Sequence, residues 1–272
     1  MKFSKLVTSI GLTVSTVLFV SNSAQAASFT TNVTQKTDAK KDILLESIEQ
    51  NEKTINQFSF VNKAVINKNT QRTNNKNSGA ASTDKGDEAS APVITAEDPD
   101  EVEIAKFLGN SNLNNIVDTE DNGSFNINVF FDSVIKADNS GLDSLFFWER
   151  GRNSDLSVQA IDSTGNIIGN AIKLLRKEQQ DAGFQIDTKE IDNSQKVGSW
   201  GVSLAQLGVT NLSGIQLSAD GTFKGPDFKV VARKSQGNFV KAVPEPGTII
   251  GLGSFAALAF VRRRKSVSNI AS

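Results

Sequence analysis

Apolar and polar residues alternate along the second half of the chain, and this alternation predicts a β-rich domain. In Phe125–Phe131 the apolar residues fall at every second position, as in a strand with one buried face. The pattern recurs at 156–161, and Leu145–Trp148 is a continuous apolar and aromatic run. Turn-forming sequences such as Asp162–Asn166 separate these stretches. We therefore predict a mainly β domain over residues 99–240, folded as an antiparallel β-sandwich or jelly roll.

The N-terminal part of the chain follows other patterns. Residues 27–61 place Ile43, Ile48 and Ile55 near helical spacing, which predicts an amphipathic helix in this segment. Residues 62–98 are dominated by Asn, Lys, Thr, Ser, Ala and Gly and contain few side chains that could be buried. Because burial must offset the entropy lost on ordering, we predict that this second segment is a disordered linker.

The first 26 residues have the three parts of a secretory signal peptide. Lys2 and Lys5 make the start positive, residues 10–20 are uncharged and mostly apolar, and Ala24 and Ala26 form a small-x-small pattern. This order of parts predicts export, with cleavage by signal peptidase directly after the small-residue pattern.

The end of the chain carries a second three-part segment, residues 243–265. It consists of a short motif, an uncharged run at 248–261 and a basic cluster. The run predicts a transmembrane helix, and the positive-inside rule places the preceding chain outside the cytoplasm. The motif is Val243, Pro244, Glu245, Pro246 and Gly247, and the basic cluster is Arg262, Arg263, Arg264 and Lys265.

This segment resembles the PEP-CTERM sorting signal of Gram-negative bacteria. The resemblance implies that exosortase, a membrane protease, removes the tail and transfers or releases the protein. It also implies a location at the cell surface or in the extracellular matrix, with an association with exopolysaccharide and biofilm. Residues 146–162 are similar to the central block of cyanobacterial exosortase-dependent surface proteins, which implies a surface location but no activity. An ordinary C-terminal membrane anchor is the alternative interpretation of the tail.

Composition restricts the chemistry of the chain. It contains no His and no Cys, so triads with an imidazole base, thiol nucleophiles and His- or Cys-ligated metals are excluded. Its net charge is −1, but six positive charges lie in the leader and the tail, so residues 27–261 carry −7. A nucleic-acid partner is therefore not expected, because phosphate binding depends on Lys and Arg. We expect a non-catalytic protein.

One motif raises the question of a metal. Asp118, Glu120 and Asn122 occupy alternate positions before Gly123, as in the first half of an EF-hand loop, and predict a calcium site. The bidentate Glu of such a loop is replaced here by Val129, and a hairpin turn explains the same residues. We expect no other cofactor.

Two further sets of residues are candidates for recognising or cleaving glycans. Trp148 and Trp200 predict sugar stacking if both are exposed, whereas burial in the core is the alternative. Glu149 and Asp155 are the carboxylates that a glycan hydrolase would use, which is the alternative to a non-catalytic role. Arg150 follows Glu149 directly, so a structural network of charges is the competing explanation for these carboxylates.

Overall fold

The computed structural model describes residues 28–70, 80–92 and 94–235, which form fifteen strands and one α-helix. A single 3-10 turn, Arg176–Glu178, lies between two of the strands. The strands are β1 (Thr30–Val33), β2 (Leu45–Gln50), β3 (Lys53–Ile55), β4 (Phe58–Ser59), β5 (Val61–Asn69), β6 (Ala81–Lys85), β7 (Asn115–Thr119), β8 (Phe125–Lys136), β9 (Leu145–Arg150), β10 (Leu156–Ile161), β11 (Ile167–Leu174), β12 (Gln180–Thr188), β13 (Ile191–Val202), β14 (Asn211–Ala219) and β15 (Asp227–Arg233), and the helix is α1 (Glu101–Leu108).

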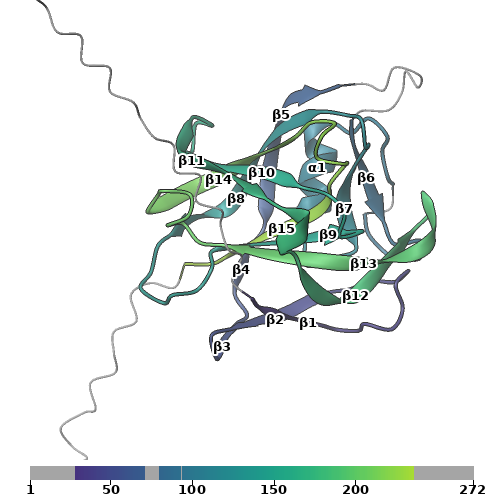
Figure 1. Cartoon of the computed structure of the whole chain (residues 1–272), viewed down its shortest axis with the longest axis horizontal. Helices are drawn as coiled ribbons and strands as arrows, with labels where there is room; N and C mark the ends of the chain where they lie inside the picture. The colour runs from purple at the N-terminus through teal and green to yellow at the C-terminus, as the bar shows by residue number, and fades with distance from the viewer. Residues whose placement is uncertain (1–27, 71–79, 93, 236–272) are drawn as a thin grey trace, which may run out of the picture. The chain divides into compact units, whose positions relative to one another are not determined.

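Two antiparallel sheets share one hydrophobic core (Figure 1). The five-stranded sheet has the order β11-β10-β14-β8-β5, and the seven-stranded sheet has the order β12-β13-β9-β15-β7-β6, with β4 paired to the end of β15. Their facing side chains form the first core, which includes Ile127 and Leu217 from one sheet and Phe147, Trp200 and Val230 from the other. The prediction of a mainly antiparallel β domain is confirmed.

A third layer covers the other face of the seven-stranded sheet. It contains the small sheet β1-β2-β3, which lies below β12 and β13 in Figure 1. Phe29 and Ile48 from this layer meet Phe146 and Trp148 of β9 in the second core. The Phe29 ring stands edge-on to the Phe146 ring, with centroids 4.9 Å apart. Strand β9 is therefore buried on both faces, which explains why its apolar run does not alternate with polar residues.

Helix α1 lies along one side of the sandwich. Its start is fixed by a capping box, in which Asp100 and Glu103 each accept from the other's backbone N–H. Ile104 and Leu108 point into the first core, and the helix contacts both β5 and β7. At its other end, the buried Lys229 of β15 donates to the Phe107 carbonyl at 2.5 Å. The helix therefore joins the two large sheets at this side.

The structure contradicts the helix predicted within residues 27–61. This segment forms β1, β2, β3 and β4 instead, and the Asn51–Glu52 turn, where both residues have positive φ, connects β2 to β3. Its apolar side chains are buried against β9 in the second core, so tertiary packing decides the local structure.

The linker predicted at 62–98 also contains ordered strands. Strand β5 pairs with β8 and strand β6 pairs with β7, while residues 71–79 lie outside the described residues. Both are terminal strands in their sheets and bury only a few small or aliphatic side chains, such as Ala64 and Ala81. A polar composition therefore concealed strands that are held largely by backbone pairing.

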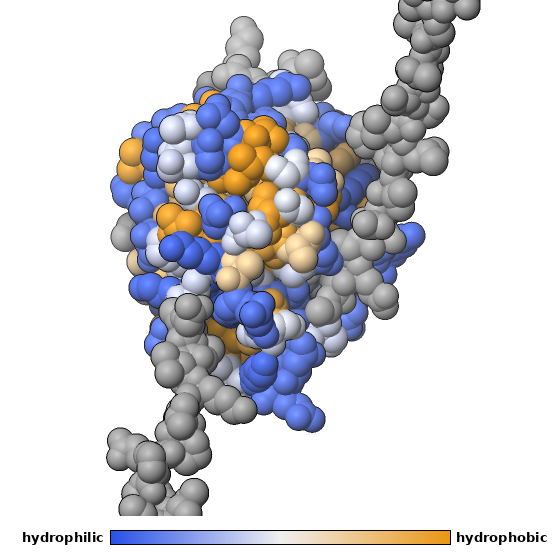
Figure 2. Space-filling model, turned by 90° about the vertical axis from the view of Figure 1, so that its left-hand side faces the viewer, coloured by the Kyte–Doolittle hydropathy of each residue, from blue (hydrophilic) through white to orange (hydrophobic). Residues whose placement is uncertain are grey.

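Both predicted targeting segments, residues 1–26 and 243–265, lie outside the described residues. Within the part of the chain that the structure describes, no helix is long and apolar enough to cross a membrane. The face of the domain in Figure 2 carries hydrophobic groups interrupted by hydrophilic side chains. Among the exposed large hydrophobic residues, Val134 and Ile167 belong to different strands.

The third layer can be tested by removing a side chain that only this layer covers. We predict that Phe146→Ala lowers the free energy of unfolding by about 3–5 kcal/mol, because it leaves a cavity in the second core. Chemical denaturation of the exported protein measures the change. Val134→Ala at an exposed position is the control and should cost about 0.5 kcal/mol or less. Equal effects of the two substitutions would mean that the third layer does not cover Phe146.

Candidate functional site

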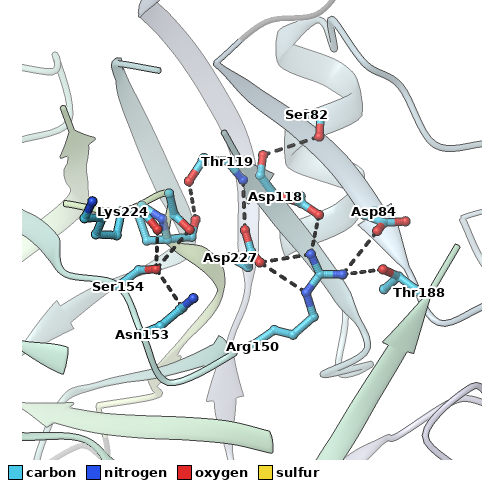
Figure 3. Close-up of polar contacts among 12 residues, drawn as sticks. Ser82, Asp84, Asp118, Thr119, Arg150, Asn153, Ser154, Thr188, Lys224 and Asp227 are labelled. Atoms are coloured by element: carbon cyan, nitrogen blue, oxygen red, sulfur yellow. Dashed lines mark hydrogen bonds and ion pairs between the residues drawn. The ribbon is translucent and has the colours of Figure 1, made fainter. Parts of the chain in front are cut away.

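Arg150, the last residue of β9, is the centre of a buried ion-pair network (Figure 3). Its Nη2 atom lies 2.6 Å from Asp118 Oδ2 and 2.9 Å from Asp227 Oδ2, and its Nη1 atom lies 3.4 Å from Asp84 Oδ2. Nη1 also donates to Thr188 Oγ1. Only 2% of the Arg150 side chain is exposed. The network therefore joins five strands, β6, β7, β9, β12 and β15, at one place.

The alternation of β9 directs Arg150 to this place. Phe146, Trp148 and Arg150 share one face of the strand, so the guanidinium lies at the end of the second core. The backbone pairing of β9 with β15 sets Asp227 directly opposite Arg150. Asp227 also accepts a 3.0 Å hydrogen bond from the Thr119 backbone, which ties the end of β7 to the network.

The charges in the network shift one another's pKa values. Burial raises the pKa of Asp118 well above its usual range, and the nearby charge of Asp227 adds to this effect. Burial likewise raises the pKa of Asp227 to about 6, although Arg150 opposes the increase. Burial disfavours the charged form of Arg150, but the carboxylates of Asp227 and Asp118 outweigh this effect and raise its pKa. The network therefore keeps Arg150 charged.

A fourth carboxyl group, from Glu190, lies against this network. Oxygens of Asp84, Asp118 and Glu190 all lie within 4.8 Å of one another. The Glu190 residue as a whole is exposed, yet its carboxyl loses hydration and faces the charge of Asp118, which raises its pKa to about 8. Three oxygens are fewer than the six to eight that calcium uses, and the Arg150 guanidinium already neutralises two of these carboxylates. The geometry therefore describes a structural clamp.

Glu149 precedes Arg150 but points to the opposite face of β9, on the side of the first core. It is fully buried, and its Oε2 atom accepts from Gln179 Nε2 at 2.9 Å. Within the described part of the chain, Glu149 Oε1 and Gln179 Oε1 have no hydrogen-bond partner. Burial raises the pKa of Glu149 to about 8, against the hydrogen bond from Gln179. The adjacent charges of β9 therefore belong to two separate environments.

The residues predicted to bind calcium serve different parts of the structure. Asp118 is buried in β7 and bound to Arg150, whereas Asn122 is exposed in the turn that follows this strand. Glu120 is half-buried and donates its backbone N–H to the Ala80 carbonyl at 2.9 Å. The Asp118 carboxylate has its partner inside the network, and calcium binding by these three residues stays a prediction.

Both tryptophans predicted to stack on sugars are buried. Trp148 is 1% exposed in the second core, and its Nε1 donates to Thr31 Oγ1 at 3.0 Å. Trp200 is 1% exposed in the first core, and its Nε1 donates to the Leu175 carbonyl at 3.0 Å. Neither ring has a face open to a ligand, because each is packed between two layers of the domain.

The other charged residues near β9 form local pairs. Asp155 is buried and lies 3.0 Å from Lys173 Nζ, and its Oδ1 accepts from the Arg176 backbone at 2.8 Å. Arg152 is half-exposed and lies 3.1 Å from Asp181. Asp155 and Glu149 therefore do not face each other across an open cleft.

Sequence reasoning missed the partners that complete the Arg150 network. Asp84 lies in the segment interpreted as a linker, and Thr188, Glu190 and Asp227 are distant from Arg150 along the chain. The sequence offered one signal: Asp227 directly precedes the apolar residues Phe228, Val230 and Val231, and a carboxylate buried beside them requires a partner. The identity of that partner depends on strand pairing, which single-sequence patterns do not specify.

Comparison with known proteins adds information about the tail. A family model described as the PEP-CTERM protein-sorting motif matches residues 242–265. Neither a curated protein nor a solved structure matches the chain. The matched segment contains the Val243–Gly247 motif, the uncharged run and the basic cluster predicted above.

The motif defines the class of the protein. It marks a surface protein that is exported and sorted by exosortase, with a membrane-anchored intermediate before surface display. Exosortase is accordingly its processing partner. The prediction of a PEP-CTERM signal is confirmed.

The role of Arg150 as a structural clamp can be tested by removing its charge. We predict that Arg150→Met lowers the free energy of unfolding by about 3–5 kcal/mol, because it leaves buried carboxylates without their cation. Arg152→Met is the matched control and should cost about 1 kcal/mol or less, because its ion pair with Asp181 is partly exposed. Chemical denaturation at neutral pH measures both changes. Similar losses for the two variants would contradict the clamp.

Glu149 should make the stability of the domain depend on pH. Its pKa is raised from 4.5 to about 8 on folding, so the folded chain holds this proton more tightly than the unfolded chain. The contribution of this bound proton to the free energy of unfolding is fully present below about pH 4.5, declines as the pH rises and is gone above about pH 8. We predict that Glu149→Gln removes this decline, so that the variant gains on the order of 3 kcal/mol over the native protein between pH 5 and pH 8.

Denaturation curves at several pH values measure this difference. The native protein and the Glu149→Gln variant share Asp118, Asp227 and Glu190, so subtracting their profiles isolates Glu149. Glu46→Gln, at an exposed position of β2, controls for the chemical change. Parallel profiles for the native protein and Glu149→Gln would show that Glu149 is charged in the folded domain.

Proposed function

We propose that this protein is a non-catalytic component of the cell surface or extracellular matrix that associates with exopolysaccharide. The observation that carries the proposal is the PEP-CTERM motif at residues 242–265. A chain sorted by exosortase presents its folded domain outside the cell, where polysaccharide is the abundant polymer of a biofilm. The resemblance of residues 146–162 to cyanobacterial surface proteins is compatible with this location.

The environments of the carboxylates support a non-catalytic role. A glycoside hydrolase needs two carboxyl groups that reach a sugar from opposite sides. Glu149 is fully buried beneath Gln179, and Asp155 is held by Lys173 and the Arg176 backbone. These two residues were the candidates for a carboxylate-based hydrolase, and neither is available to a substrate in this arrangement.

The net charge of the chain argues against nucleic acid as a partner. Residues 27–261 carry a net charge of −7, which disfavours nucleic acid. Before processing, the partners are signal peptidase, which would cleave after Ala26, the membrane around residues 248–261, and exosortase. After processing, the β domain would remain at the surface or be released into the matrix.

Removal of exosortase tests the proposal. In the parent strain we expect a mature protein that starts at Ala27, ends near Val243–Gly247 and sediments with the exopolysaccharide. In a strain without exosortase we expect the protein to keep Arg262–Lys265 and to accumulate in membranes. Intact-mass spectrometry of each fraction measures both ends of the chain.

The purified mature protein, incubated with exopolysaccharide from the same bacterium, should bind the polymer without releasing reducing ends. Release of reducing ends above the level of a heat-denatured sample would establish a hydrolase. A mature protein that retains Arg262–Lys265 in both strains would establish a plain membrane anchor and remove the basis of the matrix proposal.

A further inference from the structure

The outer face of the five-stranded sheet carries a compact group of neutral polar side chains. Strand pairing places Gln159 of β10 opposite Gln216 of β14, which is opposite Asn128 of β8. The neighbouring row has the same arrangement on the same three strands, which lie side by side in Figure 1. We call the two rows the amide strip, and its six residues are Asn126, Asn128, Ser157, Gln159, Gln216 and Ser218.

A polar outer face is normal for an antiparallel sheet, but the residue types in the amide strip are not those that strands prefer. Exposed strand positions favour β-branched and aromatic residues, and Asn is depleted there. The inward residues of the same strands follow the rule, with Ile127, Val158 and Leu217 in the first core. Strands β10, β14 and β8 are each paired on both sides, so protection of a sheet edge does not explain the choice. Local departures of this kind are expected at functional sites.

Side chains in the strip are aligned but retain unused hydrogen-bonding groups. Asn128 Oδ1 accepts from Gln216 Nε2 at 3.0 Å and from Asn67 Nδ2 at 3.0 Å. Among the described residues, no group bonds to Gln216 Oε1 or to the hydroxyls of Ser157 and Ser218. Five of the six strip residues are half-buried, and the sixth, Asn128, is buried beneath its neighbours. The network of amides therefore holds the side chains in place, and the half-buried residues keep polar atoms at the surface.

The charge and the polar groups of the strip favour one class of ligand. None of the six residues ionises, although the chain between its terminal segments carries −7. Phe130, in the row beyond Asn128, presents a half-buried ring, and Lys63 Nζ lies 5.0 Å from its centroid. Amides and hydroxyls both donate and accept hydrogen bonds, as sugar hydroxyls do, and an aromatic ring packs on the apolar face of a sugar. Lysines stand only at the two ends of the second row, where Lys173 of β11 is opposite Ser157 and Lys68 of β5 is opposite Asn126. An anionic polymer would instead require cationic side chains within the strip itself.

We propose that the amide strip is a binding site for a neutral polysaccharide that lies across strands β10, β14 and β8. This inference rests on the proposed association with exopolysaccharide and names the surface that would form the contact. Gln159 and Gln216 would donate and accept hydrogen bonds with sugar hydroxyls, and the buried Asn128 would hold Gln216 in position. Phe130 would contact the edge of the polysaccharide.

Two variants test the site in complementary ways. Gln159→Glu with Gln216→Glu keeps the shape of both side chains but replaces amide donors with carboxylates. Ser157→Val with Ser218→Val removes two hydroxyls and favours the strand conformation, so it should fold at least as well as the native protein. Each variant of the mature protein should bind dextran and laminarin, two neutral glucans, about tenfold more weakly in affinity electrophoresis.

A matched control makes the same chemical change on another sheet. Gln180→Glu with Gln185→Glu adds the same two charges at exposed positions of β12, and the carboxylate at 185 can still accept from Ser194. This control should bind both glucans as the native protein does. Thermal melting of all variants shows which have kept their fold.

The outcomes distinguish failure of the proposed site from failure of the proposed function. Equal glucan binding by native protein, strip variants and control would overturn the amide strip while leaving polysaccharide association intact. Binding of alginate or native exopolysaccharide but of no neutral glucan would also overturn it. Failure of the native protein to bind any of these polymers would overturn both proposals. Loss of a dimer in the strip variants, with no glucan binding, would assign the strip to a second copy of the chain.

Discussion

The seven-stranded sheet has a protein layer against each of its faces, and most features of the domain follow from this constraint. Its central strand β9 sends Phe147 into the first core and Phe146 and Trp148 into the second. A charged residue at the end of such a strand also becomes buried, whichever face it occupies. Arg150 is therefore surrounded by carboxylates from β6, β7 and β15, and Glu149 is enclosed beside Gln179. Burial of charge is stable only when partners are supplied, and the strand order supplies them.

The packing of three layers also determines which side chains remain available to contact a ligand. The carboxylates that most resembled catalytic or metal-binding groups are engaged within the fold, and both tryptophans lie between layers. The outer face of the five-stranded sheet has no covering layer among the described residues. It holds amides and hydroxyls in register, with free donors and acceptors. The proposed binding surface thus lies on a different sheet from the Arg150 network.

The exported location is consistent with the way in which the domain is stabilised. The chain has no Cys, so no disulfide reinforces it outside the cell. Two hydrophobic cores and a five-strand ionic clamp provide that reinforcement, and α1 connects the sheets at one side. The sorting signal stands apart from these features, since its recognition depends on a short motif, an apolar run and a basic cluster in the linear sequence.

The sequence alone determined the sorting signal and the β-rich character of the domain, because both are local. An uncharged apolar run and a PEP-CTERM motif are recognised by composition and order, and Phe125–Phe131 shows its buried face by alternation. Tertiary structure decided the rest. Residues 27–61 form strands because Phe29 and Ile48 pack on β9, and β6 is ordered because it pairs with β7. The partners of Arg150 and the alignment of Gln159, Gln216 and Asn128 depend on strand register, which long-range pairing sets and periodicity along one strand does not encode.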